Sequence, residues 1–148
     1  MSLRESIQIA LLLAIGYILH TVIPGYGGGM KPDLLLAMLF IAILLYPSFK
    51  SALLAGLIAG LITALTTSFP GGQLPNIIDK LLTSILVLGL VKVAYGRVNR
   101  YVLSGLIGII GTLFSGVVFV GSALLIVGLP PGASFGLLMT TVVLPAAA

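Results

Sequence analysis

The sequence predicts an all-α integral membrane protein, a bundle of six transmembrane helices with both chain ends on the inner side (N-in/C-in). Hydrophobic residues fill 59% of the 148 positions and charged residues only 7%, whereas a soluble chain carries roughly 25% charged residues. These are too few polar side chains to cover a surface that faces water. The apolar runs also lack the apolar–polar alternation of membrane β-strands, so helices are the expected spanning elements.

The same composition excludes several classes of function. The chain has no cysteine, and one histidine with three carboxylates leaves little for a metal site built from protein ligands. A net charge of +4 is too small and too dispersed to indicate a nucleic acid partner. The nearest approach to a nucleotide-binding P-loop, Gly25 to Lys31, lacks the spacing and the hydroxyl of that motif. We therefore expect no enzyme activity and no cofactor, and any ATP hydrolysis must come from another chain.

Proline, glycine and charged residues divide the chain into six apolar segments. Because one span takes about 20 residues, six spans use nearly the whole sequence, and residues 1–148 are expected to form a single transmembrane domain. The expected helices cover approximately residues 6–23, 31–46, 51–68, 77–95, 101–128 and 133–148.

The first two segments differ in length. Residues 6–23 follow a weak basic start at Arg4 and end at Pro24-Gly25 without a small-residue cleavage site, so we interpret them as a retained helix and not a signal peptide. Residues 31–46 form a short segment that ends at Pro47. At about 1.5 Å per residue, this segment must thin the bilayer or be shielded by neighbouring helices.

The later segments differ in their small residues. In residues 51–68 a small residue recurs every four positions, which favours close packing within the bundle. These residues are Ala52, Gly56, Gly60 and Ala64. Residues 77–95 form a span of ordinary length. Residues 101–128 exceed one span, so we expect their glycines to tilt or break the helix, and Pro130-Pro131-Gly132 separates them from residues 133–148.

Basic residues predict the orientation, because they are enriched at the cytoplasmic ends of membrane helices. With the N-terminus inside, five of the seven basic residues lie at inner ends, and only Lys31 and Lys80 lie at outer ends. The inner five are Arg4, Lys50, Lys92, Arg97 and Arg100. This distribution favours placing both chain ends on the inner side.

Two polar segments, residues 24–33 and 69–80, are expected at the outer side, and each leads into the start of a helix. The first contains three consecutive glycines, and the second contains the sequence Pro-Gly-Gly-Gln. Helix N-termini carry free amide donors and a partial positive charge, which suit the carboxylate of a small molecule. These segments are therefore the candidates for a binding site.

The side chains of these segments indicate the chemistry of the ligand. Two lysines supply positive charge, two aspartates can hold an ammonium group, and tyrosine, phenylalanine and methionine supply an aromatic or apolar surface. Together these groups fit a zwitterionic amino acid with a ring. The candidate substrate-binding residues are Tyr26, Gly27, Gly28, Met30, Lys31, Asp33, Phe69, Gly71, Gly72, Gln73, Asn76, Asp79 and Lys80.

The same residues also have structural interpretations, which the sequence leaves open. Asp33 is a favoured helix cap, and Asn76 with Asp79 resembles a capping pair. Lys31 and Lys80 can extend to lipid headgroups at the bilayer surface.

Small and polar residues elsewhere in the helices have simpler interpretations. We expect His20 to be packed and hydrogen-bonded, and Thr63, Thr66 and Thr67 to bond back to the backbone of their own helix. In the first segment, Ala10 and Ala14 share one face. That face can meet either the rest of the bundle or another protein.

Two strings carry a family resemblance. MKPDLLLAMLFIAIL (residues 30–44) and ALTTSFPGGQLPNIIDK (residues 64–80) resemble the tryptophan transport family of energy-coupling-factor S components. S components are small six-helix membrane proteins that capture a substrate outside the cell. The resemblance implies a multi-pass protein of the bacterial plasma membrane that binds L-tryptophan and works with a membrane coupling subunit and ATPase subunits.

The resemblance also implies roles for two parts of the chain. Ala10 and Ala14 match the family's A-x-x-x-A pattern, which implies that they contact the coupling subunit. The loop of residues 25–31 is implied to cover a substrate pocket that opens outside.

The leading hypothesis is therefore a membrane-embedded substrate-binding subunit for tryptophan uptake. Two alternatives stay open. One is an S component or small transporter for another ring-bearing solute, such as a vitamin. The other is a structural or channel-forming membrane protein whose loops only cap helices.

Overall fold

A computed structural model describes residues 2–24, 33–67, 71–128 and 134–147 of the chain. These residues form helices joined by short connections, and no β-strand occurs among them. The all-α class expected from the sequence is confirmed for this part of the chain.

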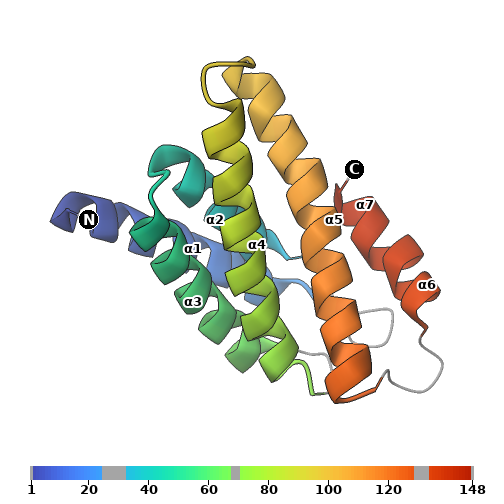
Figure 1. Ribbon diagram of the computed structural model, residues 1–148. Coiled ribbons are helices and arrows are strands. Elements are labelled where there is room, and N and C mark those ends of the chain that lie inside the picture. Colours follow the sequence, from blue (N-terminus) through green and yellow to red (C-terminus); the bar gives the residue numbers. More distant parts are fainter. Residues whose placement is uncertain (1, 25–32, 68–70, 129–133, 148) are drawn as a thin grey trace.

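Five helices of 12 or more residues precede a helical segment near the C-terminus (Figure 1). They are α1 (Leu3–Val22), α2 (Leu34–Leu45), α3 (Phe49–Thr66), α4 (Gln73–Ala94) and α5 (Arg100–Ile126). The last segment consists of α6 (Phe135–Leu138), the π-helical turn η1 (Met139–Val143) and α7 (Leu144–Ala147), which follow one another without a gap. If this segment counts as one element, the described helices fit the expected count of six.

Three of the described helices, α1, α3 and α5, are long and apolar enough to cross a membrane. α2 is also apolar but has only 12 residues. It contacts α1, α3, α4 and α5, and Leu35, Leu39 and Ile43 are fully buried among them. Neighbouring helices thus shield the buried face of this short segment.

Helix α4 begins at Gln73, before the expected start at residue 77. Pro75 lies in its first turn, where proline is tolerated because no intrahelical N–H bond is lost. Asn76 therefore lies within the helix, and its Nδ2 donates to the carbonyl oxygen of Gly72 at 2.7 Å. The interpretation of Asn76 and Asp79 as a capping pair is wrong, since Gly72 is the N-cap and makes no side-chain cap bond.

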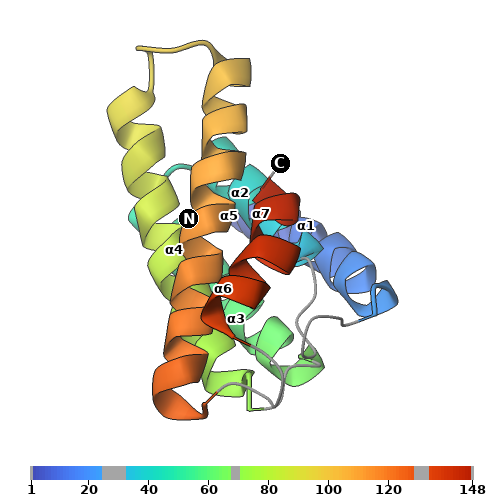
Figure 2. The ribbon, with the colours of Figure 1, turned by 90° about the vertical axis from the view of Figure 1, so that its right-hand side faces the viewer.

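Helix α5 runs unbroken for 27 residues. Of the two responses expected from its length and glycines, a break is therefore excluded. The C-terminal segment α6–η1–α7 lies along α5 and, within the described ranges, contacts no other helix (Figure 2).

Helices α3, α4 and α5 lie side by side in chain order, and α4 and α5 are joined by a short turn at residues 95–99 (Figure 1). α1 packs mainly on α2. α2 is central in the bundle, because it contacts α1, α3, α4 and α5. The interior contains two apolar clusters. The larger one draws on α1 to α5, whereas the smaller one joins the second half of α5 to η1.

Close packing of α3 on α4 depends on small residues. The four small residues predicted to pack within the bundle are all buried, which confirms that prediction. A Cβ atom added at Gly60 would lie 3.0 Å from Cα of Ile77. One added at Gly56 would lie 2.4 Å from Oγ of Ser84 and 3.0 Å from the backbone oxygen of Lys80. The two backbones are thus as close as glycine permits.

We predict that Gly60→Ala lowers the free energy of unfolding by about 1–3 kcal/mol, because a backbone atom of α4 cannot turn away from the added methyl group. The measurement is thermal or denaturant unfolding of the purified protein in detergent. Gly108→Ala in α5 is the matched control, since a Cβ there meets no atom within 4 Å. Equal unfolding midpoints for the two variants would contradict this packing.

Candidate functional site

Two of the chain's three carboxylates meet one lysine inside the helix bundle. Nζ of Lys80 lies 2.5 Å from Oδ2 of Asp33 and also pairs with Oδ2 of Asp79. Asp79 and Lys80 belong to α4 and are each only 1% exposed. Asp33 precedes α2 as its N-cap. We call Asp33, Asp79 and Lys80 the ionic cluster.

Residues from two further helices surround the ionic cluster. Nδ1 of the buried His20, in α1, lies 3.4 Å from Oδ1 of Asp33. The Thr83 hydroxyl donates to Oδ1 of Asp79 at 3.0 Å, and the side chain of Ser115 in α5 is a further hydrogen-bond partner of Asp79. The cluster therefore joins α1, α2, α4 and α5 at one place.

The spacing of polar residues in α4 explains why they gather there. Asp79 and Lys80 follow Asn76 by three and four positions, and Thr83 and Ser84 follow Asp79 and Lys80 by four, so the five residues share one face of the helix. All five are buried. The first half of α4 therefore turns a polar face toward the protein and not toward lipid, as ionisable residues in membrane helices generally do.

Asp33 is held by its place in the chain as well as by its charge. Its Oδ1 accepts from the backbone N–H of Leu36 at 3.1 Å, so the predicted capping role is confirmed. The same carboxylate pairs with Lys80 through Oδ2. The start of α2 is thus tied directly to α4.

Burying the ion pairs costs free energy, and this cost bears on whether they serve stability or function. Removing charges from water costs several kcal/mol per ion, and mutual attraction often only balances that cost. An apolar core of the same volume is therefore frequently as stable. Ionisable groups inside a membrane protein are, on that basis, candidates for a functional site.

The extension of Lys80 to lipid headgroups, one of the open interpretations, is wrong. Two carboxylates hold its ammonium group inside the bundle, and the side chain is almost completely buried. Two other structural predictions are confirmed. The hydroxyls of Thr63 and Thr66 bond to backbone oxygens of their own helix, and His20 is packed in the interior.

The structure brings three of the predicted site residues, Asp33, Asp79 and Lys80, into direct contact. Asn76 shares their face of α4, and its partner Gly72 caps the helix. Gly71 and Gln73 are exposed before and at the start of α4. The remaining candidates lie outside the described residues: Tyr26, Gly27, Gly28, Met30, Lys31 and Phe69.

Sequence reasoning missed Thr83 and Ser115 as partners of Asp79. Thr83 lies one helical turn after Asp79, and that spacing is a usable signal for a side-chain contact. Ser115 gave no comparable signal, because α5 meets α4 only in the folded chain.

Ala10 and Ala14 are both exposed on α1, whereas Ile9 and Leu13 form its buried face. Of the two possibilities left by the sequence, packing of this alanine face within the described bundle is excluded. The face is open to lipid or to another protein.

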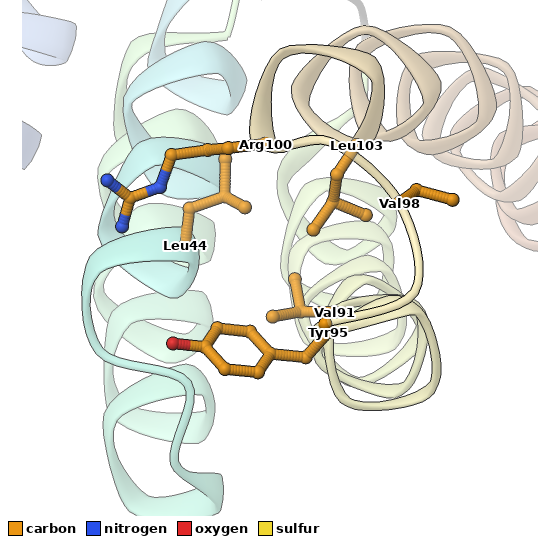
Figure 3. Close-up of a pocket in the computed structure, with 7 residues that line it drawn as sticks. Leu44, Val91, Tyr95, Val98, Arg100 and Leu103 are labelled. Atoms are coloured by element: carbon orange, nitrogen blue, oxygen red, sulfur yellow. The ribbon is translucent and has the colours of Figure 1, made fainter.

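A separate cavity of about 320 Å³ lies at the turn between α4 and α5 (Figure 3). Its lining residues are Leu44, Val91, Tyr95, Gly96, Val98, Arg100 and Leu103. Val91 follows Lys80 by roughly three helical turns, or about 16 Å, so this cavity is distinct from the ionic cluster. Its lining includes a guanidinium group but no carboxylate, and none of the predicted site residues contributes to it.

Comparison with known proteins identifies a family. The family model described as "Tryptophan transporter TrpP" matches residues 2–148. A probable tryptophan transport protein of Bacillus subtilis (strain 168) is 47% identical over 147 residues, covering 99% of this chain and 84% of the relative.

Two clostridial proteins are similar to the same extent, and each is also named a probable tryptophan transport protein. The one from Clostridium acetobutylicum is 49% identical over 146 residues, covering 99% of this chain and 84% of the relative. The one from Clostridium perfringens (strain 13 / Type A) is 46% identical over 148 residues, covering 94% and 80%. No solved structure matches the chain.

The family match covers almost the whole sequence, and the all-helical fold with long apolar helices agrees with it. The family consists of transporters and not of enzymes. This chain belongs to the tryptophan transporter TrpP family.

Proposed function

We propose that this chain is the membrane-embedded substrate-binding subunit of a bacterial uptake system for L-tryptophan. The observation that carries the proposal is the ionic cluster, a set of buried charges in a chain whose family transports a zwitterion with an aromatic ring. The chain captures tryptophan at the outer side of the plasma membrane. It catalyses no reaction on its substrate.

The proposed orientation has both chain ends inside. Basic residues support it, because five of the seven then lie at the cytoplasmic ends of helices. In this orientation α1 ends, and α2 and α4 begin, at the outer side. The ionic cluster, which contains the N-cap of α2 and the first half of α4, then lies toward the outside of the bilayer.

In the proposed complex, each part of the substrate meets a different group. The ammonium group binds a carboxylate of the ionic cluster, and the indole ring packs on apolar side chains of the two loops, Tyr26, Met30 and Phe69. Lys80 is already engaged by two aspartates. We therefore assign the substrate carboxylate to Lys31 and to the N-termini of the helices, where amide donors are free.

Energy for uptake is proposed to come from other chains. In this scheme a membrane coupling subunit contacts α1, and ATPase subunits drive the return of the binding subunit to the outward state. The exposure of Ala10 and Ala14 supports such a contact, because small residues allow another helix to approach closely within the membrane.

We expect L-tryptophan to bind the purified protein saturably, with one molecule bound per chain. Isothermal titration calorimetry measures this, and competition with other aromatic amino acids and ring-bearing vitamins defines the specificity. Preferential binding of a vitamin would favour the alternative of another solute. Absence of saturable heat with tryptophan at high micromolar concentration would contradict the proposal.

We expect Ala10→Leu or Ala14→Leu to reduce cellular tryptophan uptake by about tenfold or more, because a bulky side chain keeps the partner helix at a distance. Tryptophan affinity of the purified variants should stay unchanged, since neither residue faces the bundle. Ala37→Leu, at an exposed position of α2, is the matched control and should leave uptake intact. Equal loss of uptake and binding in the α1 variants would count against a dedicated contact surface.

A further inference from the structure

We infer that the two carboxylates of the ionic cluster have different tasks: Asp33 receives the α-ammonium group of the substrate, whereas Asp79 is a positioning residue that fixes Lys80. This inference rests on the proposed function, because it assigns a part of the substrate to one atom group of the site. It predicts that the amino group is a main determinant of specificity.

Asp79 is closed to a ligand. Its side chain is only 2% exposed, its Oδ2 pairs with Lys80, and its Oδ1 accepts from the Thr83 hydroxyl. These partners come from its own helix, and α5 packs closely on that helix. A ligand would have to displace several of these bonds to reach Asp79.

Asp33 is the accessible member of the ionic cluster. Its side chain is 17% exposed, against 2% for those of Asp79 and Lys80. It stands directly before α2, next to the candidate loop of residues 25–31. Its oxygens contact Lys80, His20 and the N–H of Leu36. A carboxylate offers about four acceptor positions, so these three contacts leave one position without a partner among the described residues.

The charge of the ionic cluster also calls for a cation. With both carboxylates ionised and His20 neutral, two carboxylates share one ammonium group, so the described residues of this site carry one negative charge in excess. An excess charge away from water is costly, and a bound ammonium group compensates it. The surrounding side chains of Thr83 and Ser115 are neutral, so among the described contacts only His20 competes for that role.

Lys80 links the closed carboxylate of Asp79 to the accessible carboxylate of Asp33. Its ammonium group is fixed between the two carboxylates, with Asp79 on the closed side and Asp33 on the accessible side. The pair Asp79–Lys80 therefore orients the carboxylate of Asp33 without touching the ligand itself. A substrate ammonium and Lys80 then share Asp33, as donors commonly share a carboxylate.

The test compares two ligands on three proteins. Dissociation constants of L-tryptophan and of indole-3-propionate, which has the ring and the carboxylate but no amino group, are measured for the full chain in detergent. The proteins are wild type, Asp33→Asn and Asp79→Asn. The two variants are matched, because each leaves Lys80 with one carboxylate and a balanced charge.

We expect wild type to bind tryptophan about tenfold or more tightly than indole-3-propionate, since a tenfold preference needs only one good charged contact. Asp33→Asn should abolish this preference by weakening tryptophan alone. Asp79→Asn should keep a preference for tryptophan, because Asp33 still accepts the ammonium group, although a smaller one than wild type because the excess charge is gone. It should also lower the affinity for both ligands or the unfolding temperature. If Asp33→Asn does not fold, Asp33→Ser, which retains a helix cap, takes its place.

The outcomes separate this inference from the proposed function. Tryptophan binding by wild type with an equal affinity for indole-3-propionate overturns the role of Asp33 and leaves the proposed function standing. So does a preference that survives in Asp33→Asn and disappears in Asp79→Asn. Failure of wild type to bind tryptophan overturns the proposed function itself.

Discussion

The pairing of Lys80 with two aspartates is the polar contact around which the described helices meet. The partners come from the start of α2 and the first half of α4, and His20 of α1 and Ser115 of α5 close around them. These contacts bring four helices together at one place. Close contact of α3 with α4 through glycine completes the enclosure, because it brings backbone against backbone beside Lys80.

Features that depend on local sequence could be predicted well. The all-helical class, the small-residue stripe of α3 and the cap at Asp33 each follow from neighbouring residues, and the structure confirms them. α4 begins four residues before the expected start, because Pro75 is compatible with a first helical turn. The two polar segments contain the aspartates and the lysine that meet in the structure, yet their mutual contact could not be foreseen. Asp33 and Lys80 are far apart in sequence, and only the packing of α2 on α4 brings them together.

Recognition and energy coupling are proposed to use different surfaces of the chain. The ionic cluster lies inside the bundle near the start of α4, whereas the alanine face of α1 points away from the bundle. The cavity at the turn between α4 and α5 lies far along the helices from the cluster and lacks a carboxylate to receive an ammonium group. In the proposed scheme, the partner binds the outer surface of the protein while the substrate stays enclosed in the bundle. The proposed role in binding also accounts for the interior position of two of the chain's three carboxylates.

The central claim is that the buried charges serve binding and are not required for folding. Replacing all three members of the ionic cluster in one protein, Asp33→Asn with Asp79→Asn and Lys80→Met, removes the charges without leaving any of them unpaired. Buried ion networks replaced by neutral groups of similar size often keep their stability. The decisive measurement is tryptophan binding by this triple variant, with its unfolding temperature recorded alongside. We expect a folded protein with a nearly unchanged unfolding temperature and no detectable tryptophan binding. Binding of tryptophan with wild-type affinity would contradict the account.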